Sequence, residues 1–385
     1  MTPNLHFTRD ELADRRVRAC AAMAEEGLDG LLMFRQESMY YLTGYDTFGF
    51  VFFQCLYLGA DGDMFLLTRA PDLRQAQHTS VIENIEIWVD RDGAEPAREL
   101  RNLLTRRGLS GKQLGVEWQS YGLTAAYGRQ LEAVLGGFVK LIDASYLVSR
   151  HRLVKSAAEL VYVEKSAALT DAALDEAIRL AHAGADEGDI LAAMQGAVFR
   201  GGGDYAGNEF IIGSGQDALL CRYKSGRRKL DPEDQLTLEY SGAYRHYHAA
   251  AMDTLIVGAP HADHIDMHAA AVEALRACEA ALQPGRPLGE VFDAHARALD
   301  AAGLSEHRLN ACGYSMGTAF APVWADWPMI YADNPVEAAP GMVFFIHIII
   351  ANSETGRAQT LGRTSVVEAQ GSRPINHENL DLVIG

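Results

Sequence analysis

Arg150–Ser156, RHRLVKS, is the stretch where the 385-residue sequence changes from one pattern of predicted secondary structure to another. Before it, short apolar runs such as Leu28–Phe34 alternate with helical segments, which is typical of an α/β domain. After it, a long Ala/Glu-rich helix runs to about Gly184, and the predicted strands then group together with helices between them. We therefore expect two domains: an α/β domain at residues 1–150 and an α+β domain at residues 151–385.

Local signals predict the first elements of the N-terminal half. Thr8 and Glu11 have the spacing of a capping box, and they predict a helix that ends near Gly27. Phe50–Gly59 and Asp63–Thr68 are apolar runs on either side of an Asp-Gly turn, which predicts a hairpin. In the second half, the predicted strands are Phe210–Ile212, Gln235–Tyr240, Met252–Val257, Met342–Ala351 and Thr364–Val367.

Charge and composition exclude several classes of partner. The sequence has 34 Lys and Arg against 51 Asp and Glu, so its formal charge is −17, which argues against a nucleic acid or an anionic membrane surface. It has no apolar run of membrane-spanning length, and its first residues lack the layout of a signal peptide. The five cysteines show no paired spacing, so we expect reduced thiols in a cytoplasmic protein.

Ionisable residues interrupt two of the predicted strands. In Leu236–Gly242, Glu239 shares one face with two hydroxyl residues, and the turn that follows carries His246 and His248. His347 lies in the middle of the apolar run Phe344–Ile350, where a buried imidazole needs hydrogen-bond partners. The residues alone leave two interpretations open for these positions, a catalytic site or ordinary strand and turn residues. No Walker loop, GxGxxG, HExxH or GxSxG motif points to another chemistry.

Four short motifs, in order along nearly the whole chain, resemble those of the pita-bread enzymes, which include methionine aminopeptidase, prolidase and creatinase. They are YLTG at Tyr41–Gly44, RLVKSAAE at Arg152–Glu159, QPG at Gln283–Gly285 and PGMV at Pro340–Val343. The resemblance implies a small α/β N-terminal domain, an α+β pita-bread catalytic domain and assembly as a homodimer.

The peptidases of that family hold two metal ions with two Asp, one His and two Glu. Carried over onto this sequence, those ligand positions fall at Glu239, Ala250, Tyr314, His347 and about Gly362. Divalent ions of this kind need clustered carboxylates, and only Glu239 retains one, with His347 as a displaced nitrogen ligand. We therefore expect neither a metal centre nor another cofactor.

Loss of the metal ligands makes the sequence similar to the metal-free branch of the family, which includes creatinase and ectoine hydrolase. Glu239, Gly242 and Tyr244–His248 match the pattern of that branch. The enzymes of that branch use a His to shuttle a proton, but the corresponding position in this sequence is occupied by Arg222. An arginine stays protonated and cannot act as a general base, but it can bind a carboxylate through two hydrogen bonds.

These observations predict a metal-independent hydrolase of a C–N bond in a small carboxylate-bearing amidine, guanidine or amide. A lyase or ring-opening enzyme on the same site, and a non-catalytic binding protein, are the alternatives. Its only expected partners are a small-molecule substrate and a second copy of the chain, whose site Phe48 and Phe50 would reach. The expected catalytic residues are Glu239, His347, His248 and Tyr314, and the expected substrate-binding residues are Arg222, Phe48, Phe50, Tyr247 and Asp253. We expect His347 or His248 to activate water, Glu239 to orient or protonate the nitrogen, and Tyr314 to donate a hydrogen bond to an oxyanion.

Overall fold

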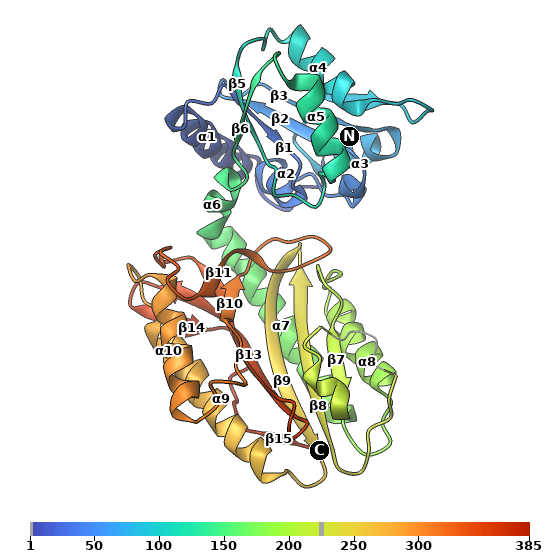
Figure 1. Cartoon of the computed structure of the whole chain (residues 1–385). Coiled ribbons are helices and arrows are strands. Elements are labelled where there is room, and N and C mark those ends of the chain that lie inside the picture. The colour runs from blue at the N-terminus through green and yellow to red at the C-terminus, as the bar shows by residue number, and fades with distance from the viewer. Residues whose placement is uncertain (1–2, 223–226) are drawn as a thin grey trace. The chain divides into compact units, whose positions relative to one another are not determined.

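The computed structural model describes residues 3–222 and 227–385. The chain divides into two compact units, Met1–Arg152 and Leu153–Gly385, each with its own sheet (Figure 1). Within the described residues, no helix combines the length and the apolar character that crossing a bilayer requires.

The N-terminal unit is built on a six-stranded sheet in the order β4-β3-β2-β1-β5-β6. The predicted hairpin is present as the antiparallel pair β2–β3, whereas β5 runs parallel to β1 and to β6. Side chains alternate along β1, so Leu31 and Leu32 point into different cores on the two faces of the sheet. The strands are β1 Gly30–Met33, β2 Cys55–Gly59, β3 Met64–Arg69, β4 Ile85–Trp88, β5 Gln113–Val116 and β6 Lys140–Asp143.

Helices cover this sheet. Thr8 caps the first of them by accepting a hydrogen bond from the backbone N–H of Glu11 at 3.1 Å, as the sequence predicts. Gln36–Thr43 has no such local signal: the buried carboxylate of Glu117 accepts hydrogen bonds from the backbone N–H groups of Phe34 and Arg35 just before it. The helices are α1 Arg9–Glu25, α2 Gln36–Thr43, α3 Leu73–Thr79, α4 Pro96–Arg106, α5 Ala125–Leu135 and α6 Leu147–Leu153.

The C-terminal unit is built on a larger, curved sheet in the order β11-β10-β12-β13-β9-β8-β7. Two further strands pair outside this order, β14 with β13 and β15 in parallel with β9. The strands are β7 Ile211–Ser214, β8 Asp234–Tyr244, β9 Tyr247–Val257, β10 Ala311–Ser315, β11 Asp326–Tyr331, β12 Val343–Asn352, β13 Arg357–Glu368, β14 Gly371–Pro374 and β15 Val383–Ile384.

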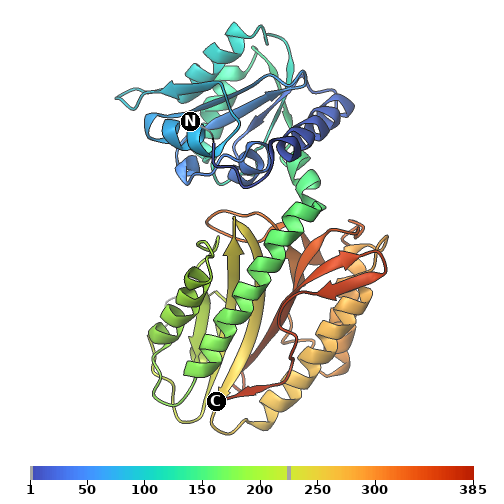
Figure 2. The same ribbon diagram turned by 180° about the vertical axis from the view of Figure 1, so that it is seen from behind.

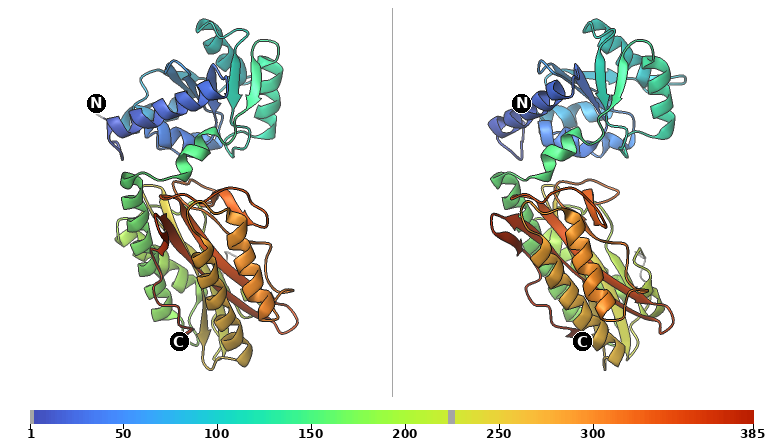
Figure 3. Two further views of the ribbon diagram at one scale, coloured as in Figure 1. Left: turned by 90° about the vertical axis from the view of Figure 1, so that its left-hand side faces the viewer. Right: turned by 60° about the vertical axis from the view of Figure 1, so that its left-hand side comes forward.

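Four helices accompany this sheet. Ser156 and Glu159 form a reciprocal capping box at the start of the long helix α7, which lies along β8 and β9 (Figure 2). The helix α9 lies along β12 and β13, with α10 beside it (Figure 3). The helices are α7 Ala157–Leu180, α8 Glu187–Arg200, α9 Ala262–Ala281 and α10 Leu288–Ala301. An α/β unit therefore precedes an α+β unit, as the sequence predicts.

The two faces of the larger sheet differ in character. On the face toward α7 and α9, which we call the helix face, Ile346 and Ile348 join the apolar core and Arg363 pairs with Glu279 of α9. Because side chains alternate along a strand, residues between these positions point to the opposite side, which we call the inner face. The inner face carries Glu239 and Ser241 of β8, His248, Ala250 and Met252 of β9, and Phe345 and His347 of β12.

Candidate active site

The inner face brings together three of the residues that the sequence singles out. Tyr314 of β10 donates a hydrogen bond from its hydroxyl to Oε1 of Glu239 at 3.0 Å. The ring centroid of Tyr314 lies 5.8 Å from that of His347. All three side chains are buried. Since β8 and β10 are not neighbours in the sheet, only its strong curvature allows this contact.

Trp324 completes this group, and no pattern in the sequence predicts its role. Its indole Nε1–H donates to the hydroxyl oxygen of Tyr314 at 2.8 Å. Its side chain is 1% exposed, so water does not compete for this bond. The result is a continuous chain of hydrogen bonds from an indole through a phenol to a carboxylate.

Glu239 has the titration behaviour of a proton carrier. Burial raises the pKa of its carboxyl to about 7, while the hydrogen bond from Tyr314 and the positive charge of Arg222 oppose the rise. A group with a pKa near the working pH can both take up and release a proton during a reaction cycle.

His347 is neutral across the usual pH range. Burial lowers its pKa to about 3, and the nearby His295 and Arg222 add to this effect. Its Nδ1 atom is buried and has no hydrogen-bond partner within the part of the chain that the structure describes. A neutral imidazole beside the Tyr314–Glu239 pair can donate or accept one hydrogen bond, but it is a weak base.

His248 also lies on the inner face, but its ring is already engaged. Its Nε2 atom accepts a hydrogen bond from the backbone N–H of Gly207 at 2.9 Å, so the proton of the neutral ring is on Nδ1. Its backbone N–H donates to the carbonyl of Gly317 at 3.1 Å, and burial lowers its pKa to about 4. His248 therefore braces two loops, and its basic nitrogen is not available to a substrate or a water molecule.

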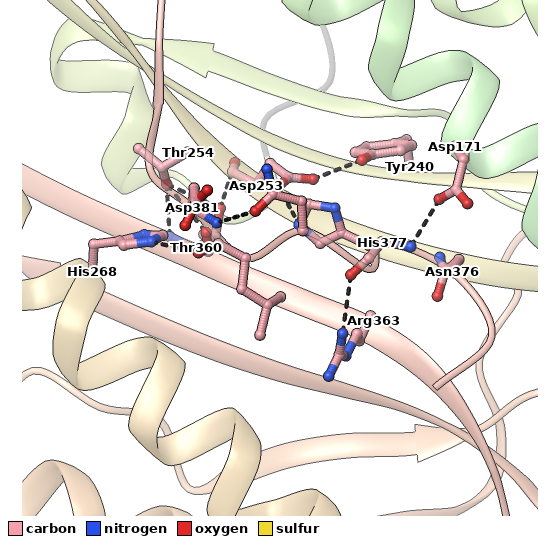
Figure 4. Close-up of polar contacts among 12 residues, drawn as sticks. Asp171, Tyr240, Asp253, Thr254, His268, Thr360, Arg363, Asn376, His377 and Asp381 are labelled. Atoms are coloured by element: carbon pink, nitrogen blue, oxygen red, sulfur yellow. Dashed lines mark hydrogen bonds and ion pairs between the residues drawn. The ribbon is translucent and has the colours of Figure 1, made fainter. Parts of the chain in front are cut away.

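Two of the expected substrate-binding residues lie on the helix face, away from this group. The hydroxyl of Tyr247 donates to Oε1 of Glu159 in α7 at 2.7 Å. Asp253 accepts a hydrogen bond from Tyr240 at 2.6 Å and forms an ion pair with His377 at 2.8 Å (Figure 4). The alternation of side chains along β9 separates both residues from Glu239, so we do not assign them to the site.

The other expected substrate-binding residues are Arg222, Phe48 and Phe50, and they differ in exposure. Arg222 is exposed, and its charge acts on Glu239, Tyr314 and His347. Phe48 and Phe50 belong to the N-terminal unit, where Phe48 is 77% exposed and Phe50 is buried.

The residues present do not fit the metal centre of the family's peptidases. Ala250 and Gly362 offer no ligand atom, and the hydroxyl of Tyr314 is already bonded to Glu239. A Cβ atom at position 362 would lie only 2.8 Å from the carbonyl oxygen of Ile346, so a longer side chain has no room there. Among the described residues, no group of three or more His, Cys, Asp and Glu side chains is placed to hold a metal ion.

The curved sheet, its flanking helices and the buried residues of the inner face define a pita-bread domain, and comparison with known proteins gives its family. The model of metallopeptidase family M24 matches residues 162–373, which is more than half of the chain, and that of the creatinase/prolidase N-terminal domain matches residues 15–154. The chain therefore belongs to metallopeptidase family M24.

Two curated relatives cover most of the chain. An uncharacterized hydrolase/peptidase of Sinorhizobium fredii is 27% identical over 99% of both chains. The ectoine hydrolase of Halomonas elongata is 25% identical over 89% of both chains. The fold is that of the solved dipeptidase PepE from Mycobacterium ulcerans, with a TM-score of 0.84 and 24% identity over 98% of this chain and 99% of that one.

Proposed function

We propose that this protein is a metal-independent hydrolase that breaks a C–N bond in a small carboxylate-bearing amidine, guanidine or amide. The observation that carries the proposal is the hydrogen bond of 3.0 Å from Tyr314 to Glu239. It joins two positions that we expect to correspond to metal ligands in the family's peptidases. Burial raises the pKa of Glu239 to about 7 although this hydrogen bond opposes the rise. The similarity to an ectoine hydrolase over 89% of the chain supports a substrate of this class.

Glu239 supplies the proton transfers. Its carboxylate takes a proton from water as the water oxygen attacks the carbon of the C–N bond, and a tetrahedral adduct forms. The resulting carboxylic acid then gives the proton to the nitrogen, and the C–N bond breaks to release an amine. A single group with a pKa near 7 suits both steps.

The neighbouring residues bind and orient the substrate. The guanidinium of Arg222 pairs with the substrate carboxylate through two hydrogen bonds, which holds the susceptible carbon near Glu239. His347, which is neutral, provides one fixed hydrogen bond to the substrate or the attacking water. These roles replace the expected proton transfer by His347 or His248, because burial lowers the pKa of both rings.

We propose a cytoplasmic homodimer with no resident cofactor and no nucleic-acid or membrane partner. In this homodimer, the exposed Phe48 of one copy would reach the active site of the other copy.

Product analysis by mass spectrometry tests the proposed reaction. The protein is incubated with ectoine, hydroxyectoine, creatine and an Xaa-Pro dipeptide, each with and without EDTA. The proposal predicts hydrolysis of a non-peptide substrate that EDTA does not reduce and that Glu239→Gln abolishes, whereas the matched variant of an exposed carboxylate, Glu354→Gln, retains it. Cleavage of the dipeptide alone, lost in EDTA, would contradict it.

A further inference from the structure

We propose that Trp324 is a positioning residue: its indole N–H holds the hydroxyl proton of Tyr314 toward Glu239. The consequence for catalysis rests on the proposed function, but the positioning itself can be measured without a substrate. Two consecutive hydrogen bonds join the three residues. Trp324 Nε1–H donates to the hydroxyl oxygen of Tyr314 at 2.8 Å, and this hydroxyl donates to Oε1 of Glu239 at 3.0 Å.

The donor and acceptor properties of the three groups fix the direction of this chain. An indole N–H can only donate, and an ionised carboxylate can only accept. A phenolic oxygen has one proton and two lone pairs, so when Trp324 occupies one lone pair the proton of Tyr314 points to Glu239. Without the indole, the hydroxyl is free to rotate away from the carboxylate.

The surroundings of Trp324 keep its indole in place. The loop that carries it, between β10 and β11, is tied to the β8–β9 turn by a hydrogen bond of 2.9 Å from Ala319 N–H to the carbonyl of His246. The ring of Phe320 in this loop stacks on that of His246 with centroids 4.1 Å apart. Trp324 is 1% exposed at the end of this braced segment, so a rigid loop delivers its N–H to Tyr314.

Loss of Trp324 is expected to weaken the bond that favours the ionised form of Glu239. The charged and titratable groups that act on this carboxyl are Tyr314 and Arg222, and both lower its pKa against the effect of burial. A hydrogen bond to a charged acceptor contributes enough to shift a pKa by about one unit. In Trp324→Phe, where the bond is weakened but the Tyr314 hydroxyl remains, the pKa of Glu239 should therefore rise by up to about one unit.

Carbon-13 NMR of the glutamate carboxyls measures this effect directly, with Glu239→Gln to assign the signal of Glu239. We expect a midpoint near 7 in the wild type. The midpoint should be about one unit higher in Tyr314→Phe, which loses the whole bond, and should rise by a smaller amount in Trp324→Phe. The control Trp327→Phe, which removes the half-buried indole that packs against the core near α10, should leave the midpoint unchanged. An unchanged midpoint in folded Trp324→Phe would overturn the inference.

Activity separates this inference from the proposed function. If a substrate is turned over, the acid limb of the pH–rate profile should move upward by the same amount in Trp324→Phe. Wild-type protein that turns over none of the substrates, but shows the predicted NMR shift in Trp324→Phe, would contradict the proposed function and support the positioning role. Equal loss of activity at every pH, with no shift of the acid limb, would mean that Trp324 is only a structural residue.

Discussion

Gly362 lies directly opposite His347 in the β12–β13 ladder, and a Cβ atom on Gly362 would lie 3.0 Å from the Cα atom of His347. The two strands therefore leave no room for a side chain at position 362, which we expect to correspond to a glutamate ligand of the family's peptidases. Gly362 also pairs with Met252, which in turn pairs with Glu239. The row that would hold a metal centre consequently retains one carboxylate, and the proposed reaction depends on proton transfer by that carboxylate.

Replacement of Glu239 is the first prediction. Glu239→Gln preserves size but cannot carry a proton, so turnover should fall by about 10²–10⁴-fold with the fold retained. Because the ionised form is the base, wild-type kcat/KM should fall as the pH drops below about 7, the pKa of Glu239. Steady-state kinetics between pH 5 and 9 check both effects. Full activity in Glu239→Gln would show that another group carries the proton.

Arg222 is expected to act mainly on substrate binding. Arg222→Ala should raise KM for a carboxylate-bearing substrate by about 10–100-fold, because a charge-assisted pair of hydrogen bonds is lost. In the wild type, the positive charge of Arg222 lowers the pKa of Glu239. Without this charge the pKa should rise, so the acid limb of the pH–rate profile should move to higher pH in Arg222→Ala. Arg297→Ala, at an exposed arginine of α10, is the control. A fall in kcat with KM unchanged would assign Arg222 to the chemical step instead.

His248 is expected to affect stability rather than proton transfer. Its Nε2 atom accepts the backbone N–H of Gly207, and its removal leaves that buried donor without a partner, at a cost of about 1–3 kcal/mol in the free energy of unfolding. His248→Ala should therefore unfold at lower denaturant concentration, with the acid limb of its pH–rate profile unchanged. A shift of the acid limb of the pH–rate profile in His248→Ala would instead show that His248 takes part in proton transfer.

The ion pair between His377 and Asp253 makes stability depend on pH. Burial lowers the pKa of His377, but the carboxylate of Asp253 outweighs this effect, and the net pKa is raised. Stabilisation by such a group is complete below the ordinary pKa of about 6.5 and is lost as the pH rises through the folded-state value. His377→Asn, which suits the positive φ of 54° at this position, should cost about 1–3 kcal/mol at pH 6 and less at pH 9.

Denaturant titrations at the two pH values measure this difference. A cost for His377→Asn that grows as the pH rises would mean that the neutral imidazole, and not the charged one, stabilises the C-terminal segment. Thr364→Ala, at a buried residue of β13 whose hydroxyl bonds the backbone N–H and carbonyl of Ala250, provides a control whose cost should not depend on pH in this way.

The sequence predicts much of the fold because its signals are local. The helix cap at Thr8 and the strand around Glu239 each depend on residues that are close together in the sequence. The structure contains both the capped helix and the strand. The start of α2 depends instead on the carboxylate of Glu117, which lies far along the chain, and no local pattern announces such a contact. For the same reason β10 and β11, which are short and irregularly paired, are not apparent in the sequence.

In the candidate site, too, some residues could be predicted from the local sequence and others could not. Glu239 and His347 are polar residues in apolar strands, which is a signal visible in the sequence. Trp324 resembles any core tryptophan until the curved sheet brings Tyr314 to it. The placement of Asp253 could have been inferred, since it is an odd number of positions from His248 along β9 and must therefore face the opposite side of the sheet.

Metal analysis of the purified protein tests the central claim most directly. The metal content of the purified protein is measured by mass spectrometry before any chelator is added. The protein is then treated with EDTA, and turnover of the substrate identified in the product analysis is compared before and after treatment. We predict far less than one bound metal ion per chain and unchanged turnover after EDTA treatment. Two tightly bound ions per chain, with activity lost in EDTA and restored by a divalent metal, would contradict it.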